Sequence, residues 1–152
     1  MGRRVKIEHL ETALHAAAQQ LLGTAFDYGV TDCPMVCLLI HDAMTDKSEA
    51  NVHRGNWSDR KTGLEYVTRT GNSLENVLRG LGCTDVAVGF QQVGDFILTI
   101  TVDGWVRGHV CLGEKVISAD RDSGVSLYST IEILTLPDHR HQILRLPAWS
   151  PQ

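Results

Sequence analysis

Cys33 and His109 have the residue types and the chain order that thiol chemistry requires. Cys33 follows Asp32 at the expected start of a helix, and His109 lies far downstream in a β-like segment. A thiol at a helix N-terminus is close to the positive end of the helix dipole and to free backbone N–H groups, which stabilise the nucleophilic thiolate. A histidine from a neighbouring strand could deprotonate that thiol and later protonate a leaving amine. Residues of these types in this order could support acyl transfer, with a cysteine as nucleophile and a histidine as general base and acid.

Both residues also have a purely structural interpretation. A buried cysteine near a helix start is commonly a small apolar residue. A strand histidine is commonly part of the core or of the surface. The residue types and their spacing leave the catalytic and the structural interpretation open.

The elements that must position this pair begin with helices. Apolar residues recur at three- and four-residue spacing over 7–22, which predicts an amphipathic helix. The segment 34–45 is apolar nearly all round, which is typical of a helix buried in the middle of a fold. A polar connection at 46–59 precedes two further expected helices, at 60–70 and 73–81.

After these helices the pattern changes to short β-like runs separated by Gly, Asp, Asn or Pro. We expect strands at 86–88, 96–102, 107–112, 115–119, 125–128, 131–134 and 142–146. Helices followed by strands, rather than alternating with them, predict an α+β domain with an antiparallel sheet. The length predicts that residues 1–152 form a single domain.

Composition narrows the classes of partner. A net charge of −4 argues against a general nucleic-acid binder, which needs a basic surface. No apolar run is long enough to span a bilayer, and no signal-peptide pattern follows the start, so we expect synthesis in the cytoplasm. Zinc binding is the rival interpretation of the four cysteines. None of them forms a Cys-x-x-Cys pair, so we expect free thiols, no metal and no cofactor.

Three segments carry a resemblance to a known family. The segment FDYGVTDCP resembles the nucleophile region of the NlpC-like cysteine peptidases, a papain-like family of cell-wall hydrolases. The segment GDFILTITVDGWVRGHVCLGEKVISADRDSGVSL resembles the second block of that family, in which a His-Val strand follows a Gly-Asp strand start. The polar segment EANVHRGNWSDRKTGLEYV is similar to a subgroup found among tailed-phage tail proteins. Each motif is short, so the specificity lies in the ordered set.

The resemblance implies an NlpC-type, papain-like α+β fold with N-terminal helices packed on an antiparallel sheet. It implies that Cys33 is the nucleophile, that His109 is the general base and acid, and that Ser118 orients the imidazole. Asp120 is an alternative orienting residue. The family usually has His, Asn or Gln at the position of Ser118 and often has tyrosine at the position of Phe26. We therefore predict that the Cys33 sulfur and the His109 ring lie within hydrogen-bonding reach.

The same resemblance implies a function. We expect a phage tail-tip-associated cysteine peptidase or amidase that cuts bacterial peptidoglycan through an acyl-enzyme. Its partners would be tail-tip or baseplate proteins, and it would be made in the host cytoplasm and carried on the virion tail. The alternative is a non-catalytic structural or assembly component of the tail tip with the same fold. A third hypothesis is a host cytoplasmic thiol hydrolase or acyltransferase, and whether the chain is an enzyme at all stays open.

Overall fold

The structure is a computed structural model that describes residues 7–149. Its helices are α1 (Ile7–Leu21), α2 (Cys33–Thr45), α3 (Glu49–His53), α4 (Arg60–Thr70), α5 (Leu74–Gly80), α6 (Thr130–Leu134) and the 3₁₀ turn η1 (Pro147–Trp149). Its strands are β1 (Thr84–Val86), β2 (Phe96–Thr101), β3 (Val106–Cys111), β4 (Lys115–Asp120), β5 (Gly124–Ser129) and β6 (His139–Arg145).

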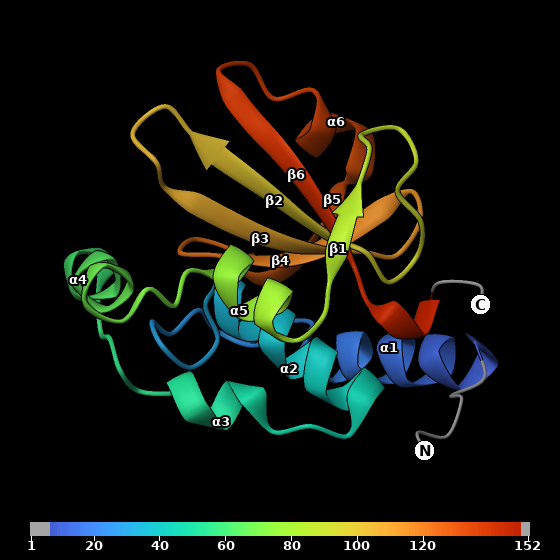
Figure 1. The fold of residues 1–152 in the computed structure, drawn as a ribbon, viewed down its shortest axis with the longest axis horizontal. Helices are drawn as coiled ribbons and strands as arrows, with labels where there is room; N and C mark the ends of the chain where they lie inside the picture. Colours follow the sequence, from blue (N-terminus) through green and yellow to red (C-terminus); the bar gives the residue numbers. More distant parts are fainter. Residues whose placement is uncertain (1–6, 150–152) are drawn as a thin grey trace.

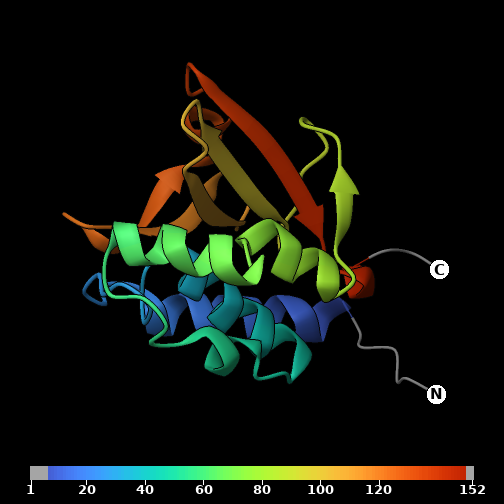
Figure 2. The same ribbon diagram turned by 60° about the vertical axis from the view of Figure 1, so that its left-hand side comes forward.

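The six strands form one antiparallel sheet in the order β1-β6-β2-β3-β4-β5. Helices α1, α2, α3 and α5 form a layer on one side of this sheet, while α6 lies on the other side (Figure 1). Figure 2 shows the same helical layer beneath the curved sheet. The predicted α+β class with an antiparallel sheet is therefore confirmed.

Helix α2 is the central helix, packed between α1 and the sheet. Asp32 begins it, because the Asp32 side chain accepts a hydrogen bond from the Met35 backbone N–H at 3.2 Å. Pro34 stands in the first turn, where its missing N–H leaves no helical hydrogen bond unmade. Eight of the 13 residues of α2 are buried, as its apolar pattern predicts.

The two faces of the sheet have separate cores. Phe96 and Leu98 of β2 pack into the large cluster shared with α1, α2 and α5. Ile97, between them, packs into a smaller cluster with Ile143 of β6 and Ile133 of α6. Successive strand residues point to opposite faces, so the position of a residue along its strand decides which core it joins.

One predicted strand is a helix. The segment 131–134 lies in α6, which Ser129 caps by accepting a hydrogen bond from the Glu132 backbone N–H at 3.4 Å. Within it Ile133 is buried, whereas Ile131 is 74% exposed. A short apolar run fits a strand and a single helical turn equally well, which is why the pattern misled.

Smaller differences concern element limits and the faces of helices. The connection at 46–59 contains the short helix α3, which the polar composition does not indicate. Strands β1 and β6 both begin before their predicted limits. In α4 the apolar residues Leu64 and Val67 are exposed, and Tyr66 is the buried residue. Helix α4 stands at one end of the molecule, so it has little core to face (Figure 1).

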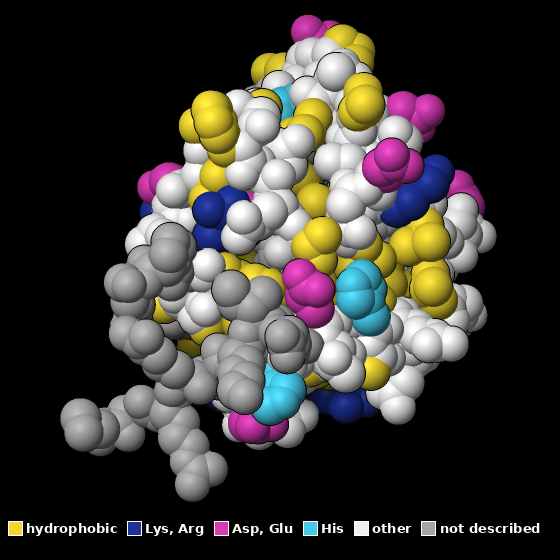
Figure 3. All heavy atoms as spheres, turned by 90° about the vertical axis from the view of Figure 1, so that its right-hand side faces the viewer, with side chains coloured by type: hydrophobic (Ala, Val, Ile, Leu, Met, Phe, Trp, Pro, Cys, Tyr) yellow, Lys and Arg dark blue, Asp and Glu magenta, His cyan; other side chains and the backbone are white. Residues whose placement is uncertain are grey.

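Helix α1 reaches the opposite end of the molecule (Figure 1). On that face the apolar side chains form several separate groups, with acidic, basic and histidine side chains between them (Figure 3). Among residues 7–149, the structure contains no helix with the length and apolar character that a membrane crossing requires.

Candidate functional site

A cleft of about 640 Å³ opens where α4, the start of α2 and two strand turns meet. The turns are the β2–β3 connection around Trp105 and the β4–β5 connection at 121–123. Five of the nine aromatic residues of the chain (three each of Phe, Trp and Tyr) line this cleft: Phe26, Tyr28, Trp57, Tyr66 and Trp105. Cys33 is also among the lining residues, so the cysteine singled out from the sequence borders this cleft.

The residue before the thiol is a satisfied carboxylate. Asp32 accepts hydrogen bonds from the Met35 backbone N–H, from the Gly29 backbone N–H at 2.8 Å and from Trp57 Nε1 at 2.6 Å. Burial raises the pKa of Asp32, and these three donors oppose that rise. Its role is to cap α2 and to fix Trp57 in the wall of the cleft.

The Cys33 thiol is held in its protonated form. It is 5% exposed, and burial raises its pKa to about 11. The negative charge of Asp32 raises the pKa further, while the backbone of Gly108 and the charge of Arg107 lower it. At pH 7 only about one thiol in ten thousand is then a thiolate. Desolvation is the largest of these effects, so the net shift of the Cys33 pKa runs against the thiolate that the helix start was expected to favour.

His109 points away from this thiol. A Cβ atom added at the preceding residue, Gly108, would lie 2.7 Å from Cys37 Sγ of α2, so that position faces the helical layer. Because strand residues alternate, His109 faces the other side of the sheet. There its Nδ1 lies 2.9 Å from the Ile97 carbonyl oxygen. In the part of the chain that the structure describes, no hydrogen bond joins Cys33 and His109, so the predicted contact is wrong.

His109 is a buried, neutral histidine. Its side chain is fully enclosed, and burial lowers its pKa to about 4, with the charges of Arg107 and His141 lowering it further and the Ile97 carbonyl opposing them. Its Nδ1 carries the proton that is donated to Ile97, and Nε2 has no hydrogen-bond partner among the described atoms. The burial of His109 agrees with the structural interpretation, left open by the sequence, in which the strand histidine is part of the core.

Ser118 does not orient the imidazole. Its hydroxyl donates to the Gly108 carbonyl oxygen at 2.6 Å, in a fully buried position of β4. Asp120, the alternative orienting residue, accepts from the backbone N–H groups of Asp122 and Ser123 and from the Tyr128 hydroxyl. Both predicted roles would require a bond to the His109 ring, and neither side chain makes one.

The sequence missed a buried polar cluster behind the cleft. His53 lies in the segment 46–59, which was predicted to be a polar connection, yet it is 3% exposed and its Nδ1 lies 2.6 Å from the Tyr66 hydroxyl. Its Nε2 lies 3.0 Å from Glu49 Oε1. The four-residue spacing of Glu49 and His53 on a short helix is the signal that could have found this pair. The cluster joins α3 to α4 and so holds one wall of the cleft.

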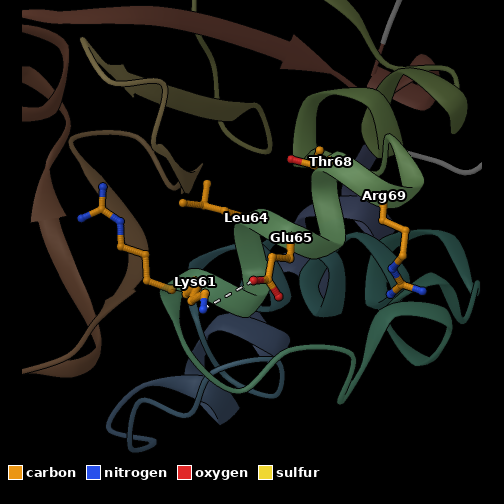
Figure 4. Close-up of a pocket in the computed structure, with 6 residues that line it drawn as sticks. Lys61, Leu64, Glu65, Thr68 and Arg69 are labelled. Carbon is orange, nitrogen blue, oxygen red and sulfur yellow. Dashed lines mark ion pairs between the residues drawn. The ribbon is translucent and has the colours of Figure 1, made fainter.

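A second hollow runs along the outer side of α4. Its lining residues all belong to that helix, and its ion pair, Lys61 with Glu65 at 3.9 Å, is exposed (Figure 4). Side chains of a single helix surface do not converge on a bound ligand, so the cleft beside Cys33 is the stronger candidate site. In residues 7–149 no group of three or more His, Cys, Asp or Glu side chains is placed to hold a metal ion.

Comparison with known proteins gives a family and no activity. No curated protein matches the sequence. A family model described as "Domain of unknown function (DUF6950)" matches residues 5–135, which is most of the chain. The chain therefore belongs to the DUF6950 family.

Proposed function

We propose that this chain is an NlpC-like, papain-like domain of a tailed-phage tail tip that works as a structural or assembly component, without thiol turnover. The observation that carries the proposal is the separation of Cys33 and His109 onto opposite faces of the sheet. The NlpC-type assignment is supported by a cysteine at the start of a central helix that packs on an antiparallel sheet. The tail-tip assignment is supported by the resemblance of the segment around α3 and α4 to phage tail proteins.

Acyl transfer at Cys33 needs a base beside the thiol. The charged groups that act on the Cys33 thiol are Asp32 and Arg107. The oxygens of Asp32 already accept three hydrogen bonds, and a guanidinium does not give up its proton in proteins. Neither residue can therefore take the place of His109.

The peptidase hypothesis keeps one favourable observation, which is that Cys33 lines a cleft large enough for a peptide segment. The direct test is release of soluble muropeptides from purified peptidoglycan by the wild-type protein and by Cys33→Ala, with lysozyme as positive control. We expect both proteins to stay at background. Release by the wild type that disappears in Cys33→Ala would overturn the non-catalytic proposal.

The tail-tip location has a separate test. Peptide mass spectrometry of purified phage tails should detect this chain in a constant ratio to the tail-tip proteins. Its absence from intact tails, with presence in the host cytosol, would favour the host thiol enzyme hypothesis instead.

A further inference from the structure

Two walls of the cleft beside Cys33 differ in how firmly they are anchored. Helix α4 is the firm wall, since the Tyr66 hydroxyl lies 2.6 Å from His53 Nδ1 and the Tyr66 ring lies 5.1 Å from that of Trp57, measured between centroids. Trp57 in turn donates a hydrogen bond to Asp32. These contacts tie α4 to α3 and to the start of α2. Moving α4 away from the cleft would break a buried polar cluster, which is costly.

The β2–β3 turn at 102–105 has no such anchor. The last pair of the β2–β3 ladder is Ile100 with Val106, so the turn extends beyond the paired part of the hairpin. In the part of the chain that the structure describes, the hydrogen bonds of the turn run only to Thr101 at its own base and to Arg60. The turn is therefore a self-contained unit at the ends of two strands, and it can move as one body.

Arg60 of α4 joins the two walls. Its Nη2 lies 3.0 Å from Asp103 Oδ2, and its guanidinium carbon lies 4.5 Å from the Trp105 ring centroid. The side chains of Arg60 and Asp103 are 52% and 66% exposed, so this bridge spans the cleft on its solvent side. An exposed ion pair and an exposed cation–π contact each stabilise little, so the bridge holds the turn loosely.

We propose that the turn 102–105 is a strap across the opening of the cleft, held shut by Arg60. When the contacts of Arg60 break, the strap swings away and widens the opening, while α4 and Trp57 stay in place. Salt screens the exposed ion pair, so the strap opens further as the ionic strength rises. This inference goes beyond the proposed function and does not depend on it, because the strap controls access to the cleft whether or not the cleft turns over a substrate.

The test measures how closely a bulky probe approaches each tryptophan. The protein is labelled with fluorotryptophan, its resonances are assigned with single Trp→Phe variants, and their broadening by the uncharged nitroxide TEMPOL is measured by fluorine NMR. Raising NaCl from about 20 mM to about 1 M should increase the broadening of Trp57 and Trp105 by roughly twofold, as expected for loss of an exposed ion pair. Trp149, which is buried and does not line the cleft, is the internal reference and should not respond.

Two variants separate the contacts of Arg60. Asp103→Asn removes the ion pair and keeps an oxygen for the Thr101 hydroxyl, so at low salt it should show the broadening that the wild type reaches at high salt. Arg60→Gln also loses the stacking contact and should show more broadening still. Neither variant should respond further to salt. Lys61→Gln removes the same charge one residue along α4 and should keep the full salt response of the wild type.

Three results would overturn the inference. The first is a wild-type Trp57 that does not respond to salt. The second is a salt response that persists in Asp103→Asn or in Arg60→Gln, and either variant is sufficient if the other does not fold. The third is a response confined to Trp105, which would mean that the guanidinium leaves the ring while the turn stays in place.

The two proposals fail separately. Muropeptide release that depends on Cys33 would defeat the non-catalytic function and leave the strap standing. A cleft whose probe access does not depend on Arg60 would defeat the strap and say nothing against the absence of turnover.

Discussion

The buried imidazole of His109 should make the protein less stable as the pH falls. Its pKa is about 4 in the folded chain, against 6.5 for a free histidine side chain. The unfolded state therefore takes up a proton first, and the folded state loses stability as the pH falls from about 7 to 4. The two pKa values give a loss of about 2 kcal/mol at pH 5 and about 3 kcal/mol at pH 4.

The assay is urea unfolding of the wild type and of His109→Asn at pH 7, 6, 5 and 4, followed by circular dichroism. Asparagine cannot titrate here, and its amide N–H can still reach the Ile97 carbonyl. All other titratable groups are common to both proteins, so the difference between the two pH dependences isolates position 109. We expect the wild type to lose about 3 kcal/mol more than the variant between pH 7 and 4.

Equal pH dependences would refute the reasoning. They would mean that His109 is solvated in the folded protein, as a histidine that shares the cleft with Cys33 would be. The same variant therefore also tests the direction in which β3 presents its side chains.

Two further predictions concern the packing around the cleft. Gly108→Ala should lower the free energy of unfolding by about 1–3 kcal/mol, because the new Cβ would lie 2.7 Å from Cys37 Sγ. Gly80→Ala, at the end of a helix and facing open space, is the matched control, and an equal loss of stability in urea there would contradict the packing argument. Arg60→Ala removes the ion pair and the stacking contact that join α4 to the β2–β3 turn, so alkylation of the cleft thiol should accelerate by roughly two- to fivefold. Lys61→Ala, one residue further along the same helix, should leave that rate unchanged. A similar acceleration in Lys61→Ala would show that the contacts of Arg60 with Asp103 and Trp105 do not specifically limit access to the thiol.

The helical layer could be predicted because its signals are local. Asp32 and Pro34 mark the start of α2, and the continuous apolar surface of 34–45 places it in the centre. Both follow from residues within a few positions of each other. The short helices α3 and α6 escaped because one turn of helix offers too little periodicity to separate it from a loop or a strand.

The site was mispredicted for a different reason. The sequence places Cys33 at a helix start and His109 on a strand, and both placements are confirmed. Whether the two side chains meet depends on the register of β3, and a shift of one residue exchanges the faces of the sheet. The pattern around Gly108 does not reveal that the helical layer packs against the glycine and not against its neighbour.

The absence of an activated thiol at Cys33 is tested most directly by its alkylation rate as a function of pH. Iodoacetamide labelling should be followed by peptide mass spectrometry, in the wild type and in His109→Asn. We predict an apparent pKa near 11 and, at pH 7, a rate at least roughly a hundredfold below that of a free model thiol, unchanged in the variant. An apparent pKa below that of a free thiol, together with a loss of reactivity in His109→Asn, would contradict the account.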